Sequence, residues 1–283
     1  MRNPSSQPLG SHGNVLIPLA LAVLGFTSTI AQLLLVRELV SVFYGNELLL
    51  GLILAAWLLW VALGAGGLGE RLAEWRASER GGQRGIWPLV LVMGLTVILL
   101  PAQMALIRHL PALLTPAPGV QVALGPAALT TVVVLMPLCI ALGVQFALGA
   151  HWLRAVGGQV TWAYLYESLG AVVGGTLFSL GLVRWLNPFQ VALLIGGVNL
   201  VVGGGLGFVR LCRRYWVVFL LGFPLLILVV FPLGHWLHLT TLQAQYGPGL
   251  VYAADSPYGR LVVLERGGQH VFYENGLLSF ETQ

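Results

Sequence analysis

Long apolar segments occupy most of this chain, and they constrain its fold more than any other feature. A helix needs about 20 apolar residues to cross the hydrocarbon core of a bilayer, and seven segments meet this length. Hydrophobic residues make up 57% of the sequence and charged residues 8%, which is too few charges to cover a soluble globule of this size. The predicted spans are 15–35, 48–68, 86–107, 129–150, 163–183, 189–209 and 216–237.

These spans predict an all-α polytopic membrane protein of about seven transmembrane helices with a short C-terminal antiparallel β segment. We divide the sequence into a polar tail (1–14), a transmembrane helical domain (15–238), and a linker with a partial β-hairpin or meander domain (239–283). Arg2 is the one arginine before the first span. This span is longer than a signal-peptide core and lacks a convincing cleavage site, so we interpret it as uncleaved. Tryptophans near span ends fit an interfacial belt: Trp75, Trp87, Trp152, Trp162, Trp185, Trp216 and Trp236.

The arginines predict the orientation of these spans, because cytoplasmic loops are enriched in positive charge. Nine arginines share the side of the N-terminus, whereas the opposite side has Arg37, Arg108 and Arg184. We therefore expect a multi-pass protein of the bacterial plasma (inner) membrane with a cytoplasmic N-terminus. An odd number of spans then places the β segment on the other side. The nine are Arg2, Arg71, Arg76, Arg80, Arg84, Arg154, Arg210, Arg213 and Arg214.

The same residues limit the partners and cofactors of the chain. All fourteen basic residues are arginines scattered along the sequence without a dense patch, so the lipid bilayer is an expected partner and nucleic acid is not. Cys139 and Cys212 lack the spacing of a disulfide framework or metal site, and we interpret both as free thiols. We expect no metal site, because no two of the span-end histidines stand at i and i+4: His109, His151, His235 and His238.

Charged residues between the first two spans form a candidate intramembrane polar site. Arg37, Glu38 and Glu47 lie close to or within apolar sequence in the stretch QLLLVRELVSVFYGNELLLG, where an unpaired charge is costly. In one interpretation, Arg37 pairs with a carboxylate from Glu47 or from Glu167 on another span. In the other, this stretch is an interfacial loop with hydrated charges.

Glu167 lies one or two turns into the fifth predicted span. A carboxylate at this depth could bind a cationic ligand or relay protons. It could equally be stabilised by the dipole at the helix start and extend its charge to the interface. Gly170 and Gly174 follow it with the small-xxx-small spacing of a helix-packing face.

Two turn dipeptides organise the C-terminal β segment. Gly267-Gly268 and Asn275-Gly276 favour hairpin turns with positive φ. They separate three predicted strands, at 260–265, 269–274 and 277–280. So small a sheet needs another sheet, a helix or a partner to cover one face. We interpret Asp255, Glu265 and Glu274 as charges on the strand surface.

Several short pieces of the sequence resemble one known family. They are SPYGR at 256–260, YENG at 273–276, LLLVRELVSVFYGNELLLG around Arg37, ALGAGGLGERL at the end of the second span, and AYLYESLGAVVGG around Glu167. Together they resemble the membrane-bound branch of the spermidine synthase-like proteins, the polyamine aminopropyltransferases.

The resemblance implies a membrane region, a small β domain, and then a Rossmann-like domain that binds decarboxylated S-adenosylmethionine and transfers its aminopropyl group to a diamine. The family's glycine-rich nucleotide loop and catalytic Asp have no counterpart in residues 1–283, so no catalytic residue is assigned. We expect no cofactor in this chain. Decarboxylated S-adenosylmethionine enters as co-substrate only if the catalytic domain is supplied. Soluble relatives commonly have Gln after the Tyr of the first strand, where this chain has Gly259.

Three functions follow as hypotheses. The first is the membrane-embedded N-terminal part of such a transferase of polyamine biosynthesis, inactive alone, with a protein partner, oligomer or missing C-terminal domain completing the sheet. The second is a structural subunit or scaffold that uses its glycine faces and its exposed β edge. The third is a transporter of small cations such as polyamines, in which Arg37, Glu47 and Glu167 line a polar pathway.

Overall fold

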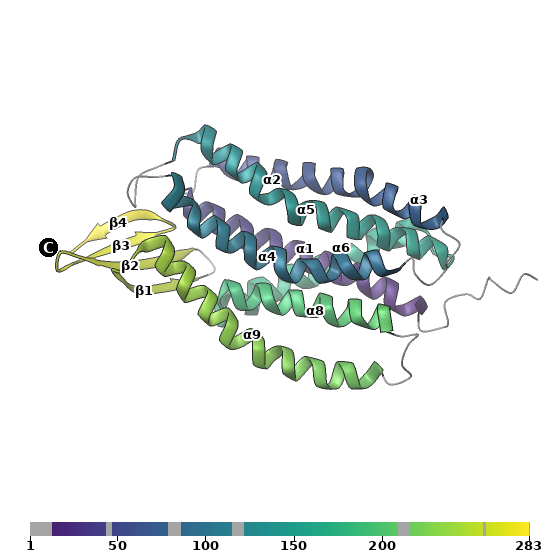
Figure 1. The fold of residues 1–283 in the computed structure, drawn as a ribbon. Coiled ribbons are helices and arrows are strands. Elements are labelled where there is room, and N and C mark those ends of the chain that lie inside the picture. The colour runs from purple at the N-terminus through teal and green to yellow at the C-terminus, as the bar shows by residue number, and fades with distance from the viewer. Residues whose placement is uncertain are drawn as a thin grey trace, which may run out of the picture.

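A bundle of long helices carries a small antiparallel sheet at one end (Figure 1). The predicted fold class is confirmed. The computed structural model describes residues 13–43, 47–78, 86–114, 122–208, 215–256 and 259–282, but not the side chains of 13, 14, 76–78, 208 and 215–227.

Six helical segments in this part of the chain are long and apolar enough to cross a membrane, which matches the first six predicted spans. The seventh predicted span, 216–237, lies in the next long helix, and most of its side chains lie outside the described residues. The long helices are α1 (Gly13–Val42), α2 (Glu47–Ala62), α4 (Trp87–Leu114), α5 (Leu124–Ala155), α6 (Val160–Leu177), α8 (Pro188–Phe208) and α9 (Tyr215–Tyr246).

Two of the spans contain a π-helical turn. The turn η1 (Leu63–Gly69) joins α2 to α3 (Glu70–Ser78), and η3 (Phe178–Leu182) joins α6 to α7 (Val183–Trp185). A π turn within an α-helix is uncommon and often lies near a functional site.

Helices α1 and α6 run parallel and in backbone contact. A Cβ at Gly25 would collide with the carbonyl of Glu167, and a Cβ at Gly170 with that of Ala22. A side chain at Gly174 would press on Phe26 in the same way. The small-xxx-small face thus lies against α1, as close packing between membrane helices requires.

The sheet has four strands, in the order β1 (Leu250–Asp255), β2 (Arg260–Arg266), β3 (Gln269–Glu274) and β4 (Leu277–Glu281), each antiparallel to the next. The three predicted strands match β2, β3 and β4 to within one residue at each end. The first strand was not predicted, because no turn dipeptide marks it and its apolar residues follow a long helix. In addition, α9 continues to Tyr246, so much of the predicted linker from 239 is helical.

Both predicted hairpin turns have the expected backbone. Gly267 and Gly268 have φ of 60° and 81°, and Asn275 and Gly276 have φ of 49° and 83°. Each pair is a two-residue loop between strands. The positive φ values match the right-handed twist of the flanking strands.

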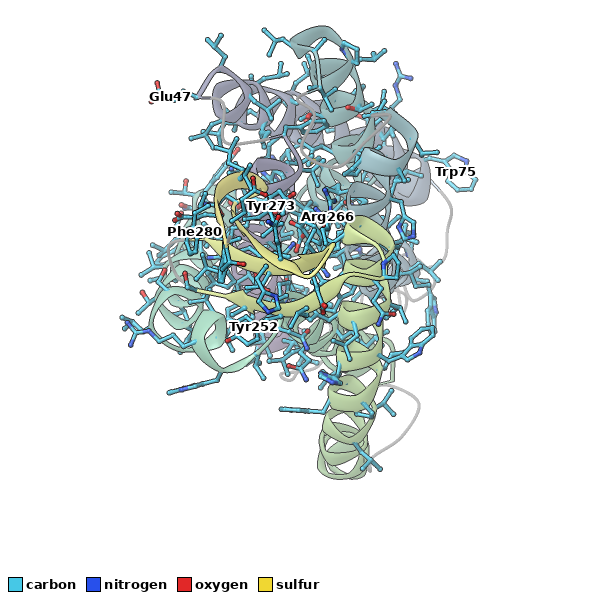
Figure 2. The ribbon with its side chains drawn as sticks, turned by 90° about the vertical axis from the view of Figure 1, so that its left-hand side faces the viewer. Glu47, Trp75, Tyr252, Arg266, Tyr273 and Phe280 are labelled. Atoms are coloured by element: carbon cyan, nitrogen blue, oxygen red, sulfur yellow. The ribbon has the colours of Figure 1, made fainter. Side chains whose placement is uncertain are left out.

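One face of the sheet is covered and the other is open. Val262, Leu264, Val271 and Tyr273 are buried, and they pack with Tyr246 at the end of α9. On the opposite face, pairing aligns four side chains across all four strands, which we call the outer apolar row. Figure 2, viewed from the sheet end, labels two of its members, Tyr252 and Phe280. The row is Tyr252, Val263, Phe272 and Phe280.

Candidate functional site

A buried carboxylate joins the bundle to the sheet. Glu38, in the last two turns of α1, is 1% exposed. Its two oxygens accept four hydrogen bonds, two from Arg108 and two from Arg260. A carboxylate offers about four lone-pair sites, so Glu38 is fully satisfied in a place where an unpaired charge would be very costly.

Arg108 of the helical bundle supplies the first guanidinium that pairs with Glu38. It lies near the end of α4 and is completely buried. Its Nε and Nη2 donate to Glu38 at 2.8 and 2.6 Å, which is the two-point geometry of a strong guanidinium–carboxylate pair. Its Nη1 donates to Thr241 Oγ1 of α9 at 2.9 Å. The guanidinium also lies 4.9 Å from the ring centre of Phe189 on α8, a cation–π contact.

Arg260 brings the second guanidinium from the start of β2, and it is 4% exposed. Its Nη1 and Nη2 donate to Glu38 at 3.0 and 2.7 Å, and its Nε donates to Asp255 of β1 at 2.9 Å. Burial alone lowers the pKa of Arg260, but the charges of Glu38 and Asp255 outweigh it and raise this pKa well above its ordinary value. Arg260 therefore stays protonated at any pH at which the protein would be studied.

Asp255 is not the surface charge that the sequence suggested. Its side chain is 12% exposed and is paired with Arg260. Its other oxygen lies 3.9 Å from Nε2 of His238, a contact that is ionic only if the imidazole is protonated. The prediction missed this because a charge at a strand end is ordinarily solvated.

The side chain of Arg37, next to Glu38, contacts the backbone beside the sheet. Its Nη2 donates to the carbonyl oxygen of Ser256 at 2.6 Å, in the turn after β1. Adjacent residues on α1 thus hold both ends of the β1–β2 connection, because Glu38 binds Arg260 just beyond the same turn.

We call Glu38, Arg108, Asp255 and Arg260 the ion cluster. Two carboxylates and two guanidiniums balance in charge, and their hydrogen bonds link α1, α4, β1 and β2. Such a network fixes the relative position of the elements that it joins. Glu38 has no lone pair left for a substrate or metal ion, and the described residues contain no group of three metal-ligating side chains.

A cavity of about 430 Å³ lies beside the ion cluster, between β1, α9 and the α7–α8 connection. His238 and Asp255 line it and also border the cluster. Arg184 and Trp185, both exposed, form its rim. The cluster thus has one face next to open space at the junction of bundle and sheet.

The predicted site residues do not all come together. Glu38 is the centre of the cluster and Arg37 lies beside it, but Glu47 is exposed at the start of α2, at the edge of the bundle in Figure 2. The backbone of Glu167 lies against Gly25, and the twelve residues from Gly25 to Arg37 correspond to about 18 Å of helix. Glu167 therefore lies too far along the bundle to form a direct ion pair with Arg37.

Sequence reasoning missed the partners of Glu38. In the sequence, Arg108 indicates only the orientation of the spans, and Arg260 begins a predicted strand without any sign of a site role. A usable signal was present, since Arg108 lies within the apolar stretch MALIRHLPALL and a charge there requires a partner. No protein-family model, curated protein or solved structure matches this chain.

Proposed function

We propose that this chain is the membrane region and initial β unit of a spermidine synthase-like aminopropyltransferase, and that its own task is to hold the β unit in a fixed position at the membrane surface. The observation that carries the proposal is the ion cluster. Two pieces of sequence that bear the resemblance, LLLVRELVSVFYGNELLLG and SPYGR, meet there through Glu38 and Arg260.

A third piece, YENG, joins the same contact. Asn275 forms two hydrogen bonds with the backbone of Arg260. Its side-chain Oδ1 accepts from the Arg260 N–H, and its backbone N–H donates to the Arg260 carbonyl oxygen. A side chain at Gly259 would collide with Asn275, which accounts for glycine where soluble relatives have Gln. These contacts support reading the three pieces as parts of one structural unit.

Catalysis in this proposal belongs to a Rossmann-like domain, supplied by continuation of the polypeptide or by a separate chain. That domain would bind decarboxylated S-adenosylmethionine and make the assembly a transferase of polyamine biosynthesis. The outer apolar row supports such a neighbour, because Tyr252 and Phe280 are both 58% exposed on a sheet of only four strands.

The proposed location is the bacterial plasma membrane, with the N-terminus in the cytoplasm and the sheet on the opposite side. The distribution of arginines supports this orientation, and two of the few arginines at the sheet end are held in specific contacts. An enzyme reporter fused after Gln283 tests it. Activity of a periplasmic reporter is expected, and activity of only a cytoplasmic reporter would reverse the assignment.

The decisive experiment concerns the natural gene. We expect the codons after 283, or an adjacent gene, to encode an acidic, His-containing stretch and a glycine-rich strand–turn–helix. The complete product should release methylthioadenosine from decarboxylated S-adenosylmethionine when a diamine is present. If neither reading frame encodes such a domain, the transferase proposal fails.

The outer apolar row also favours a second candidate, an integral-membrane scaffold whose sheet binds another protein. Purification in mild detergent separates the two functions. A stable complex with a protein that lacks a nucleotide-binding domain would favour the scaffold. A monomer without any partner would contradict the scaffold.

A further inference from the structure

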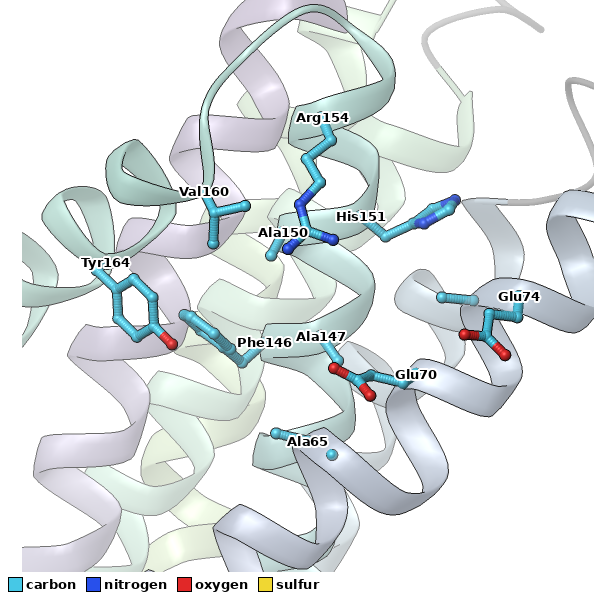
Figure 3. A pocket seen from close by; sticks show the side chains of 12 residues that line it. Ala65, Glu70, Glu74, Phe146, Ala147, Ala150, His151, Arg154, Val160 and Tyr164 are labelled. Carbon is cyan, nitrogen blue, oxygen red and sulfur yellow. The ribbon is translucent and has the colours of Figure 1, made fainter.

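A second cavity lies at the other end of the bundle, remote from the ion cluster. It has a volume of about 310 Å³ and opens between α3, α5 and α6, next to the π turn η1 (Figure 3). Its size is at the lower end of small-molecule sites, which span about 300–1,000 Å³. Twelve residues line it, and five of them have polar side chains.

The polar side chains carry both signs of charge. Glu70 and Glu74 come from α3, one turn apart on the same face, and His151 and Arg154 come from the last turns of α5. Figure 3 shows the Arg154 side chain extending down along α5 toward Ala150, with both carboxylates on the neighbouring helix. Within the described part of the chain, neither carboxylate nor Arg154 has an ion pair or hydrogen bond through its side chain.

A purely cationic ligand would meet Arg154 in this cavity, and a purely anionic ligand would meet two carboxylates. A zwitterion satisfies both sets of charges at once. An ammonium group donates up to three hydrogen bonds, which suits two carboxylates, and a phosphate suits a guanidinium. The charges therefore select a ligand in which an amine and a phosphate are a short distance apart.

The rest of the cavity is apolar and lies at the depth of the membrane interface. Its wall includes Gly66, Ala147 and the rings of Phe146 and Tyr164, whose centres are 4.9 Å apart and whose planes are tilted by 47°. Trp162, on the first turn of α6, is 46% exposed. Exposed tryptophans at helix ends mark the headgroup level of a bilayer.

We propose that this cavity binds the phosphoethanolamine headgroup of a phospholipid, with the ammonium on Glu70 and Glu74 and the phosphate on Arg154 and His151. The acyl chains then leave past Phe146 and Gly66 into the bilayer. This site is independent of the proposed transferase role, because it uses none of the residues of the ion cluster.

Two neighbouring glycines provide a matched test of the cavity. A side chain at Gly66 or at Gly67 would begin in open space, with no atom within 4 Å of the added Cβ. Only Gly66 lines the cavity. Gly66→Trp should therefore fill the site without disturbing the fold, whereas Gly67→Trp should leave it open.

The experiment is native mass spectrometry of the purified full chain with added dioleoyl phosphatidylethanolamine, phosphatidylcholine or phosphatidylglycerol. Wild type and Gly67→Trp should retain phosphatidylethanolamine about fivefold better than phosphatidylglycerol, which lacks the cation, the effect of one exposed charge pair. Phosphatidylcholine keeps the positive charge but cannot donate hydrogen bonds from it, so it should also be retained about fivefold less well, the effect of roughly one hydrogen bond. Gly66→Trp should lose this preference. Glu70→Gln with Glu74→Gln should lose discrimination against phosphatidylglycerol, and Arg154→Gln should weaken phosphatidylethanolamine retention.

Free phosphoethanolamine is the arm that separates a lipid from a soluble ligand. If it displaces the lipid at equal concentration, the assignment to a phospholipid is wrong. Equal retention of all three lipids by wild type would also overturn the proposal, as would equal behaviour of Gly66→Trp and Gly67→Trp.

Discussion

At the scale of single residues, the ion cluster depends on one carboxylate that serves two guanidiniums. Glu38 pairs with both Arg108 of the bundle and Arg260 of the sheet, and it is buried. Removing one member of a buried ion pair leaves its partner charged and unpaired, which costs more than the pair contributes. Glu38 is therefore the residue at which substitution should cost most.

We predict that Glu38→Gln lowers the free energy of unfolding in mixed micelles by about 3–5 kcal/mol, because two buried guanidiniums lose their counter-charge. Glu47→Gln is the control, since this carboxylate is exposed at the start of α2. Its effect should stay within about 0.5 kcal/mol. Equal stability of the two variants would show that the cluster contributes nothing.

A second prediction at this scale concerns the guanidinium of Arg260, which donates to two carboxylates at once. In Arg260→Lys the charge is kept, but one ammonium cannot reproduce the paired bonds to Glu38 together with the bond to Asp255. Hydrogen exchange of the β1 and β2 amides should become faster, while α1 and α4 keep their protection. Arg266→Lys, at the exposed end of the same strand, should change neither. Unchanged exchange in Arg260→Lys would mean that apolar contacts alone hold the sheet.

At the scale of elements, the bundle is held by backbone contact as well as by side chains. Helices α1 and α6 approach so closely at Gly25 and Gly170 that a methyl group would meet a carbonyl oxygen. This contact also sets Glu167 of α6 at the level of Gly25 along α1, far from Arg37. The glycines thus determine which polar residues can meet.

We predict that Gly170→Ala lowers the free energy of unfolding by about 1–3 kcal/mol, the usual cost of forcing extra volume into a packed interface. Gly51→Ala is the matched control, because its Cβ would meet nothing and alanine favours the helix. Thermal unfolding in one detergent compares the two variants. A Gly170→Ala protein as stable as Gly51→Ala would contradict the close contact.

At the scale of the whole molecule, the two ends of the bundle differ in chemistry. The sheet, the ion cluster and the larger cavity lie at one end, and α3 with the mixed-charge cavity lies at the other (Figure 1). These ends should face opposite sides of the membrane, whichever side is cytoplasmic.

Single cysteines test this arrangement in a background in which Cys139 and Cys212 are replaced by serine. A membrane-impermeant thiol reagent added to sealed vesicles should label Ser279→Cys or Glu74→Cys, but not both from the same side. Both positions are exposed, so accessibility does not differ for another reason. Labelling of both from one side would require an even number of crossings between them.

The spans, the hairpin turns and the small-residue face of α6 follow from the sequence alone, because hydropathy, glycine conformation and residue spacing are local properties. Strand β1 was missed because it lacks a local turn signal. The partners of Glu38 were missed for a different reason. Arg108 and Arg260 are 70 and 222 residues away from it, and only the packing of α1, α4 and the sheet decides which of several buried charges meet.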